Sequence, residues 1–453
     1  MKDIKISVIG AGSGAFSLQL IRDLCLTPSL AGSTVSFMDI DEQRLDAAHT
    51  LCTRYAAELG AGLSMEKTTD RRASLDGADF VVTTALSAPH ERLRAGWEIA
   101  RRHGYRWGGS YHVMYDEAFW INFYQLRLFE SIAEDILQVC PSAWHLLVAN
   151  PVLAGVTHLG RRYPNARTVG ICHGSHAVYS VADILGLKRS DISFEVSGVN
   201  HFIYLTSLRA RGVNGFRVLD EWIRDKSEDH WKTSTNDPLC PKLVDIYRRF
   251  GVLPIGDTAS WSGASWPWWY HSDDATEKRW LQDPAWGWQD YFSHVEKNAR
   301  DIQLWSADPN IRVSDCIPPD RSEEIMIPLI ESIARDMPRV FITNIMNTRG
   351  LVEGVPENFQ VELPTLVSGR GVQGMRTVPL PAAVRAHILR DRVAPVELEL
   401  DAFIRGSREM LAELVLTDRW SVSEAQVGSF IDEILSLPYH AELREHYRKT
   451  GGL

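Results

Sequence analysis

The chain has 453 residues, 45% of them hydrophobic, which is enough to fill two hydrophobic cores and predicts two domains with a cleft between them. Its formal net charge is -10, and its basic residues form no stripe that could follow a phosphate backbone, which argues against a nucleic-acid partner. Because no run of 18 apolar residues occurs and the first residues already have a strand pattern, we expect a cytoplasmic protein without a membrane segment.

The first part of the chain alternates strand and helix patterns, as a parallel sheet requires, since parallel strands need crossover connections. The expected strands are 4–9, 34–38, 80–85, 144–149 and 168–171. The expected helices are 17–26, 42–59, 124–139 and 177–187. We therefore predict an α/β protein whose N-terminal domain, residues 1–195, is a Rossmann-type doubly wound sheet.

The pattern changes after about residue 193. Strand-like segments 194–197 and 202–207 are followed by long loops and a tryptophan-rich region, and then by two expected helical regions, 384–410 and 422–437. Seven of the 15 tryptophans lie between Trp261 and Trp288, where core packing, contact between subunits and stacking on a sugar are all open uses. These features predict a second, α+β domain over residues 196–453.

A glycine-rich turn follows the first strand and opens the first helix. Gly10 permits a tight turn, Gly12 lets the backbone approach a pyrophosphate, and with Ser13 they form the expected phosphate-binding segment. Asp39 ends the second strand, where a carboxylate receives the ribose hydroxyls of adenosine and repels a 2′-phosphate. NAD is thus favoured over NADP; the alternative is an ordinary glycine turn followed by an acidic helix start.

Polar side chains follow three later strand-like segments, at Asn150, at Cys172-His173 and at Asn200-His201. Strand carboxyl ends are where ligands collect in open α/β sheets, so these residues are expected to converge on one pocket. Cys172 and His201 offer a thiolate and an imidazole, which suit a divalent transition ion. The alternative for Cys172 is a small buried hydrophobic residue.

Two carboxylates stand out as acid or base candidates. Asp257 lies in the constrained segment Pro254-Ile255-Gly256-Asp257-Thr258, and Asp116 follows a polar, aromatic stretch. Either carboxylate could equally be a helix cap, which is a common role of aspartate before a helix.

Taken together, the chain resembles glycoside hydrolase family 4 over nearly its full length. Within that family, Cys-His-Gly resembles the branch of α-glucosidases and α-glucuronidases, whereas the branch acting on 6-phosphosugars carries Cys-Asn; His173 therefore argues against a phosphorylated substrate. The motifs that carry the resemblance are Ala11-Gly12-Ser13 with Phe16-Ser17-Leu18, Met38-Asp39-Ile40-Asp41, Ala149-Asn150-Pro151, Cys172-His173-Gly174, Gly198-Val199-Asn200-His201 and Pro254-Ile255-Gly256-Asp257-Thr258.

The resemblance implies a nucleotide domain like that of lactate and malate dehydrogenases, a tightly held NAD, Mn²⁺ and assembly as homodimers or homotetramers. It further implies that Cys172 and His201 bind the metal, and that Asn150 holds substrate hydroxyls near the metal and the nicotinamide. His173 and Asn200 are expected beside the substrate. Asp257 stands where α-glucosidases have a carboxylate proposed as a base, and Asp116 matches an aspartate thought to assist the leaving group.

The reaction implied is hydrolysis of an α-glucoside by transient oxidation at C3, loss of the C2 proton, elimination and addition of water, with no net redox change. α-Glucuronidase or α-galactosidase activity by the same route remains open. A malate- or lactate-type dehydrogenase is a more distant alternative, as is a nucleotide-binding sensor that has lost the chemistry.

Overall fold

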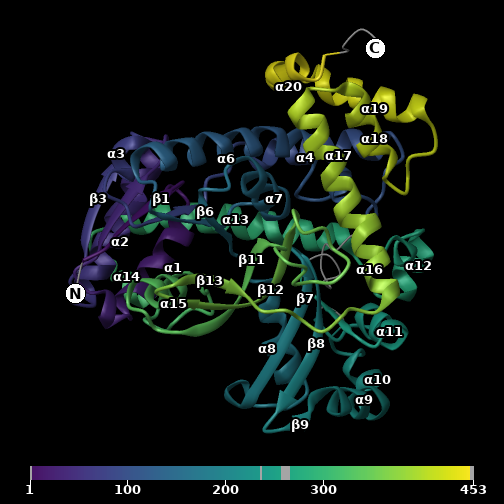
Figure 1. Cartoon of the computed structure of the whole chain (residues 1–453), viewed down its shortest axis with the longest axis horizontal. Helices are drawn as coiled ribbons and strands as arrows, with labels where there is room; N and C mark the ends of the chain where they lie inside the picture. The colour runs from purple at the N-terminus through teal and green to yellow at the C-terminus, as the bar shows by residue number, and fades with distance from the viewer. Residues whose placement is uncertain (1–2, 235–236, 257–265, 449–453) are drawn as a thin grey trace.

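Strand β1 (Lys5–Ile9) is buried at four of its five positions and lies inside a sheet that runs through the molecule (Figure 1). The computed structural model describes residues 3–234, 237–256 and 266–448. Six parallel strands in the order β3-β2-β1-β4-β5-β6 form the N-terminal part of the sheet. This is the order of a dinucleotide-binding fold. The other five strands are β2 (Thr34–Met38), β3 (Ser64–Thr68), β4 (Phe80–Thr83), β5 (Trp144–Leu147) and β6 (Arg167–Gly170).

Helices cover both faces of this parallel sheet, as a doubly wound fold requires. Helices α1 and α2 pack on one face, while α3 and the long helix α6 pack on the other. The crossover helices and turns are α1 (Gly14–Cys25), α2 (Glu42–Glu58), α3 (Arg71–Leu75), α4 (His90–Arg102), α5 (Tyr111–Met114), α6 (Phe119–Val139), α7 (Val152–Arg162) and α8 (Ala177–Ile184).

The sheet continues into the second half of the chain with antiparallel strands. Strand β11 joins β6 through one residue pair, Asn344 with Gly170, and β7 joins β12 through another, Glu362 with Gly198. The order from β6 outward is β11-β12-β7-β8-β10, with β13 on β12 and β9 on β8. These strands are β7 (Ile192–Val199), β8 (Phe202–Ala210), β9 (Val213–Asn214), β10 (Leu253–Ile255), β11 (Arg339–Met346), β12 (Gln360–Ser368) and β13 (Gly371–Gly374).

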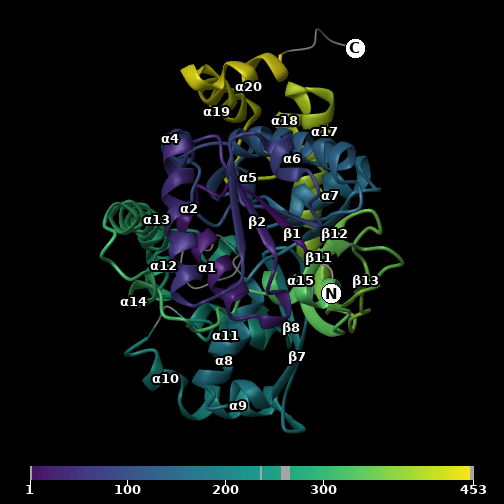
Figure 2. The same ribbon diagram turned by 90° about the vertical axis from the view of Figure 1, so that its left-hand side faces the viewer.

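The remaining helices lie around and beyond this sheet. The β7–β8 hairpin projects at one end with α9 and α10, and the last helices cover the opposite end (Figures 1 and 2). These helices are α9 (Gly215–Asp225), α10 (Ser227–His230), α11 (Pro241–Phe250), α12 (Asp274–Arg279), α13 (Pro284–Ala307), α14 (Val313–Cys316), α15 (Met326–Ala334), α16 (Ala382–Ile388), α17 (Ala394–Arg405), α18 (Arg408–Leu416), α19 (Glu424–Ser436) and α20 (Ala441–His446). In the part of the chain that the structure describes, no helix has the length and apolar character needed to cross a membrane.

The expected strand at 34–38 agrees with β2 at both ends, and the α/β class is confirmed. The single helix expected over 384–410 is divided. Helices α16 and α17 run on through a π-helical segment, Leu389–Val393, and end at Gly406, whose φ of 64° lies in the left-handed region. A glycine in that conformation stops a helix, so α18 starts separately.

Candidate active site

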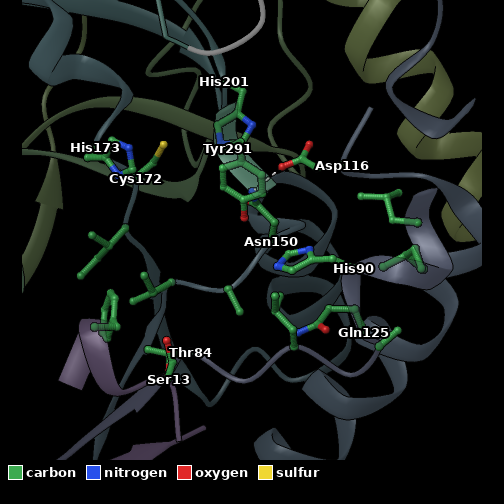
Figure 3. A pocket seen from close by; sticks show the side chains of 18 of the residues that line it. Ser13, Thr84, His90, Asp116, Gln125, Asn150, Cys172, His173, His201 and Tyr291 are labelled. Atoms are coloured by element: carbon green, nitrogen blue, oxygen red, sulfur yellow. Dashed lines mark hydrogen bonds between the residues drawn. The ribbon is translucent and has the colours of Figure 1, made fainter. Parts of the chain in front are cut away.

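A cavity of about 470 Å³ lies at the carboxyl ends of the parallel strands β4, β5 and β6 (Figure 3). The N-terminal half contributes Ser13 from the glycine turn and the residues that follow these strands. The second half contributes His201, Tyr291 and Glu324. The cavity is thus formed by both halves of the chain at the edge of the sheet where ligands of α/β proteins bind.

The glycine turn after β1 is held by its own backbone and by Asp39. The amides of Gly10 and Ala11 donate to the Met38 carbonyl at 2.9 and 3.0 Å, and Gly10 has a φ of 92°. The Gly12 amide donates to Asp39 Oδ2 at 2.8 Å, and a Cβ at Gly12 would stand 2.6 Å from that oxygen. Ser13 precedes the first residue of α1 and lines the cavity, so the positive end of the α1 dipole faces it.

Asn150 and Asp116 meet in the cavity although 34 residues separate them. Asn150 follows β5, and its Nδ2 donates to Asp116 Oδ2 at 2.9 Å. Asp116 lies between α5 and α6. This hydrogen bond ties the Asp116 carboxyl group to the Asn150 amide and favours one orientation of it.

Cys172 and His173 follow β6. The Gly174 amide donates to Cys172 Sγ at 3.4 Å, which stabilises a thiolate. His173 is exposed, and its Nδ1 lies 3.8 Å from Glu324 Oε1. Burial raises the pKa of the Glu324 carboxyl, and the nearby His173 lowers it to a smaller extent.

His201 occupies a two-residue turn between β7 and β8, with a φ of 62°. This conformation is uncommon for a residue with a side chain and is found most often at functional positions. The His201 side chain is buried yet lines the cavity, and Figure 3 shows it pointing into the same part of the cavity as Cys172.

The donor set around His201 fits a divalent transition ion. Among the described residues, one ligand atom each of Asp116, Glu117 and His201 lies within 4.8 Å of the other two. With Cys172 in the same cavity, sulfur, nitrogen and oxygen ligands are all present, and this mixture suits Mn, Fe, Co or Ni better than Ca.

Comparison with known proteins identifies the family. The model described as "Family 4 glycosyl hydrolase" matches residues 5–187, and the model described as "Family 4 glycosyl hydrolase C-terminal domain" matches residues 196–421. The chain belongs to glycoside hydrolase family 4.

Curated relatives of this family 4 hydrolase have several activities. The α-glucosidase of Erwinia rhapontici is 24% identical, with 95% of this chain and 97% of that protein covered. The α-galactosidase of Bacillus subtilis is 23% identical, with 94% and 95% covered, and the α-galacturonidase of Thermoanaerobacterium saccharolyticum is 24% identical, with 92% and 91% covered. Family membership is thus shared by enzymes that act on different sugars.

Solved structures show the same fold. A 6-phospho-α-glucosidase from gut microorganisms, in complex with NAD and Mn²⁺, has a TM-score of 0.77 at 18% identity, with 99% of this chain and 100% of that chain covered. The lactate dehydrogenase of Eimeria maxima, with NADH and oxamate, has a TM-score of 0.54 at 14% identity, with 90% and 96% covered. The expected likeness of the nucleotide domain to lactate and malate dehydrogenases is confirmed.

Not every residue expected at the site of the hydrolase lines the cavity. Ser13 of the glycine turn does, whereas Gly10, Gly12 and Asp39 do not. Asn200 is fully buried and does not line the cavity. Its backbone amide donates to Gln360 Oε1 at 3.0 Å, and its side-chain Nδ2 donates to Glu362 Oε2 at 3.1 Å. It therefore holds the hairpin turn beside His201, and its expected contact with substrate stays a prediction. Asp257 lies outside the described residues.

Tyr291 was not predicted as a site residue, but α13 places it in the cavity near Asn150 and Asp116 (Figure 3). Desolvation of its hydroxyl and, to a smaller extent, the charge of Asp116 raise the pKa of Tyr291 even though 44% of the residue is exposed, so the hydroxyl stays protonated at neutral pH. Its ring meets His90 edge-on at a centroid distance of 5.7 Å. The sequence does hold a signal for this residue, because Trp288, Tyr291 and Phe292 are spaced to lie on one face of a helix.

Proposed function

We propose that this family 4 hydrolase is an NAD- and divalent-metal-dependent α-glycosidase whose substrate is a neutral α-glucoside. The observation that carries the proposal is a single cavity lined by Ser13 of the glycine turn, by Cys172 and His201, and by the Asn150–Asp116 pair. An α-galactosidase or α-glucuronidase with the same mechanism is the second candidate, because relatives of similar identity include an α-galactosidase and an α-galacturonidase.

The residues of this chain fit both NAD and a divalent metal ion. Gly10, Gly12, Ser13 and Asp39 would hold NAD, and Cys172 and His201 would bind Mn²⁺ or another divalent transition ion. When bound, these groups supply a reversible hydride acceptor for sugar C3 and Lewis-acid stabilisation of negative charge on the C2 and C3 oxygens.

The protein side chains then hold the sugar and move protons. Asn150 contacts the sugar hydroxyls, Asp257 takes the proton from C2, and Asp116 gives a proton to the departing glycosidic oxygen. The 2.9 Å bond from Asn150 fixes the orientation of Asp116 and supports its role. For Asp257, support comes from its neighbour in sequence: Gly256 lies beside the His201 backbone, since a Cβ at Gly256 would stand 3.2 Å from the His201 carbonyl oxygen.

The charge of the cavity favours a neutral sugar. None of the described residues that line it is a lysine or an arginine, the side chains that usually bind a phosphate or a uronate carboxylate. Its acidic side chains, Asp116 and Glu324, offer no positive charge that could pair with a phosphate or a uronate carboxylate. The branch of the family that acts on 6-phosphosugars carries Cys-Asn, so His173 after Cys172 supports a substrate without a phosphate.

A panel of 4-nitrophenyl glycosides tests this proposal, with NAD, Mn²⁺ and thiol added. We expect release of 4-nitrophenol from the α-glucoside with catalytic NAD, and little or none from the α-galactoside, the α-glucuronide or a 6-phosphoglucoside. Preference for a uronide would contradict the neutral substrate, and accumulation of one NADH per turnover would support a dehydrogenase.

Replacing Asp257 by Asn is expected to suppress exchange of the C2 proton with solvent deuterium. Normal exchange in this variant would show that Asp257 is not the base.

We further propose that the enzyme works in the cytoplasm as a homodimer or homotetramer. The outer face of the antiparallel strands supports assembly, because Val340 and Leu366, paired across β11 and β12, are 55% and 38% exposed. Light scattering after size-exclusion chromatography tests it, and a monomeric mass at micromolar concentration would contradict the proposal.

A further inference from the structure

A group of charged side chains is buried directly behind the cavity. Glu117 follows Asp116 in sequence, but it is fully buried and does not line the cavity. Its Oε2 accepts a bond from Arg392 Nη2 at 3.1 Å, and its Oε1 lies 3.6 Å from His201 Nδ1. Glu117 thus stands between His201 and an arginine of the C-terminal helices.

Further contacts fix Glu117 and its partner Arg392. Asn122 Nδ2 donates to the Glu117 carbonyl and to Glu399 Oε1, both at 2.8 Å. Arg392 is 1% exposed, belongs to the π-helical segment, and its guanidinium carbon lies 3.6 Å from the centre of the Tyr111 ring. Single π-helical turns inside α-helices are frequent at functional sites.

Stability alone does not explain such a group. Burying a carboxylate or a guanidinium costs several kcal/mol per ion, and apolar residues of the same volume are often as stable or more so. In addition, Glu117 Oε1 has no hydrogen-bond donor within reach among the described residues. A fully buried acceptor left in this way is unfavourable, so this oxygen calls for a donor, and the His201 Nδ1 lies 3.6 Å from it.

We propose that Glu117 is a positioning residue that orients His201 as a metal ligand. Attraction to the Glu117 carboxylate favours the His201 tautomer with a proton on Nδ1, which leaves the Nε2 lone pair for a cation in the cavity. Arg392 in turn holds the Glu117 carboxyl group in place through the hydrogen bond to its Oε2. The proposal rests on the proposed metal-binding function of His201, and carboxylates commonly support metal-binding histidines in this way.

The test measures Mn²⁺ binding with NAD present and no sugar, by titration of the electron paramagnetic resonance signal of free Mn²⁺. We expect Glu117→Gln to weaken Mn²⁺ binding roughly 10- to 100-fold. Glu130→Gln is the matched control, because Glu130 Oε1 lies 2.8 Å from the buried His158 Nε2, between α6 and α7 and away from the cavity residues. It is expected to leave Mn²⁺ affinity unchanged.

Absorption of the Co²⁺-loaded protein separates positioning from direct binding. At saturating Co²⁺ we expect Glu117→Gln to keep the thiolate charge-transfer band and the ligand-field spectrum of the wild type, because the ligands are the same. A changed ligand-field spectrum would make Glu117 a ligand and overturn the proposal, as would unchanged Mn²⁺ affinity in Glu117→Gln. If Glu117→Gln does not fold, Arg392→Lys takes its place. It is likewise expected to weaken Mn²⁺ binding and to keep the Co²⁺ spectrum, and unchanged Mn²⁺ affinity or a changed spectrum would overturn the proposal.

The failure of the proposed function would look different. If the wild type does not bind Mn²⁺, or if Cys172→Ser and His201→Ala bind it as the wild type does, the metal site itself is wrong. If those two variants lose the metal while Glu117→Gln and Arg392→Lys both keep full affinity, only the role of Glu117 is wrong.

Discussion

The absence of a side chain at Gly12 shapes the glycine turn after β1. Its amide bonds to Asp39 Oδ2 at 2.8 Å, and a Cβ would stand 2.6 Å from that oxygen and 2.8 Å from the carboxyl carbon. Both contacts are closer than real Cβ atoms tolerate, so a methyl group there has to displace either Asp39 or the turn. The residue proposed to bind the ribose is thus placed by the residue proposed to lie against the phosphates.

Replacing Gly12 by Ala is therefore expected to weaken NAD binding at least tenfold, which is about 1.4 kcal/mol. Isothermal titration with NAD measures the change. Gly62→Ala is the control, because nothing lies within 4 Å of its Cβ and its φ is not positive. Equal NAD affinity in Gly12→Ala and wild type would show that this turn does not carry the dinucleotide.

His145 is a buried histidine in the middle of the parallel sheet. Its Nε2 lies 2.9 Å from Thr83 Oγ1, its Nδ1 lies 3.3 Å from Thr168 Oγ1, and burial lowers its pKa to about 4. The unfolded chain, with a histidine pKa near 6.5, binds a proton between pH 6.5 and 4 that the folded chain does not. The stability that His145 contributes is therefore present above pH 6.5 and is lost as the pH falls toward 4.

We expect the free energy of unfolding to fall by on the order of 3 kcal/mol over this range through His145 alone. Urea unfolding at several pH values, compared between wild type and His145→Asn, measures it. The curve of His145→Asn should be flatter by that amount, while His294→Asn, at an exposed position on α13, should follow the wild type. Parallel curves for His145→Asn and wild type would contradict this assignment.

Helix α13 brings the second half of the chain to the cavity. It packs against α1 and α2, and its aromatic face carries Tyr291, whose ring contacts Trp288 at 5.9 Å and Phe292 at 5.4 Å. Tyr291 is 44% exposed and faces the cavity beside Asp116, the residue proposed to assist the leaving group. An aromatic ring there can stack on the group that departs.

Tyr291→Ala is accordingly expected to raise KM roughly fivefold for aryl glucosides, with a smaller change in kcat, because an aromatic contact is worth about 1 kcal/mol. Tyr291→Phe should stay near wild type if the ring, and not the hydroxyl, makes the contact. Leu304→Ala, at a 65% exposed position on the same helix, is the control. A fall in kcat with unchanged KM in Tyr291→Ala would instead assign the residue to the chemical step.

The elements that the sequence predicted are those with local signals. Hydrophobic periodicity and the positions of glycine and proline predict the glycine turn, β2 and the strands before Asn150 and Cys172. The structure has these elements within a few residues of the expected bounds. Strands β11 and β12 were not predicted, although they carry the sheet from β6 to β7. They pair with each other along eight residues, and only one residue pair each joins them to β6 and β7, more than 160 residues away in sequence. The setting of His201 was missed for the same reason: its partner Glu117 comes from a distant segment, and spacing alone does not indicate which buried carboxylate faces which ring.

At the scale of the whole molecule, the core does not divide at residue 195. One apolar cluster joins Leu18 and Ile21 of α1 to Ile327 and Ile330 of α15. A second cluster joins α6 and α7 of the N-terminal half to α17 and α19 near the C-terminus. The division into residues 1–195 and 196–453 stays a prediction, but apolar contact across it means that neither part buries its own surface alone.

The fragment 1–195 is therefore expected not to fold stably, even though it contains the whole nucleotide turn and six parallel strands. Removing the second half would expose the apolar faces of α1 and α2 that Ile302, Met326 and Ile330 cover, and each such side chain contributes about 1.5–3 kcal/mol when buried. Circular dichroism of the purified fragment, with the full chain as control, should show no cooperative thermal transition and no shift with NAD.

In the full chain, NAD at a hundred times its Kd should add about 2.7 kcal/mol to the stability of the folded state. Because the cavity takes Ser13 from one half and His201 and Glu324 from the other, we expect that gain to protect amides of α15 from hydrogen exchange as well as those of α1. A fragment that melts cooperatively and binds NAD as the full chain does would show two independent domains, and the coupling between the two halves would then be wrong.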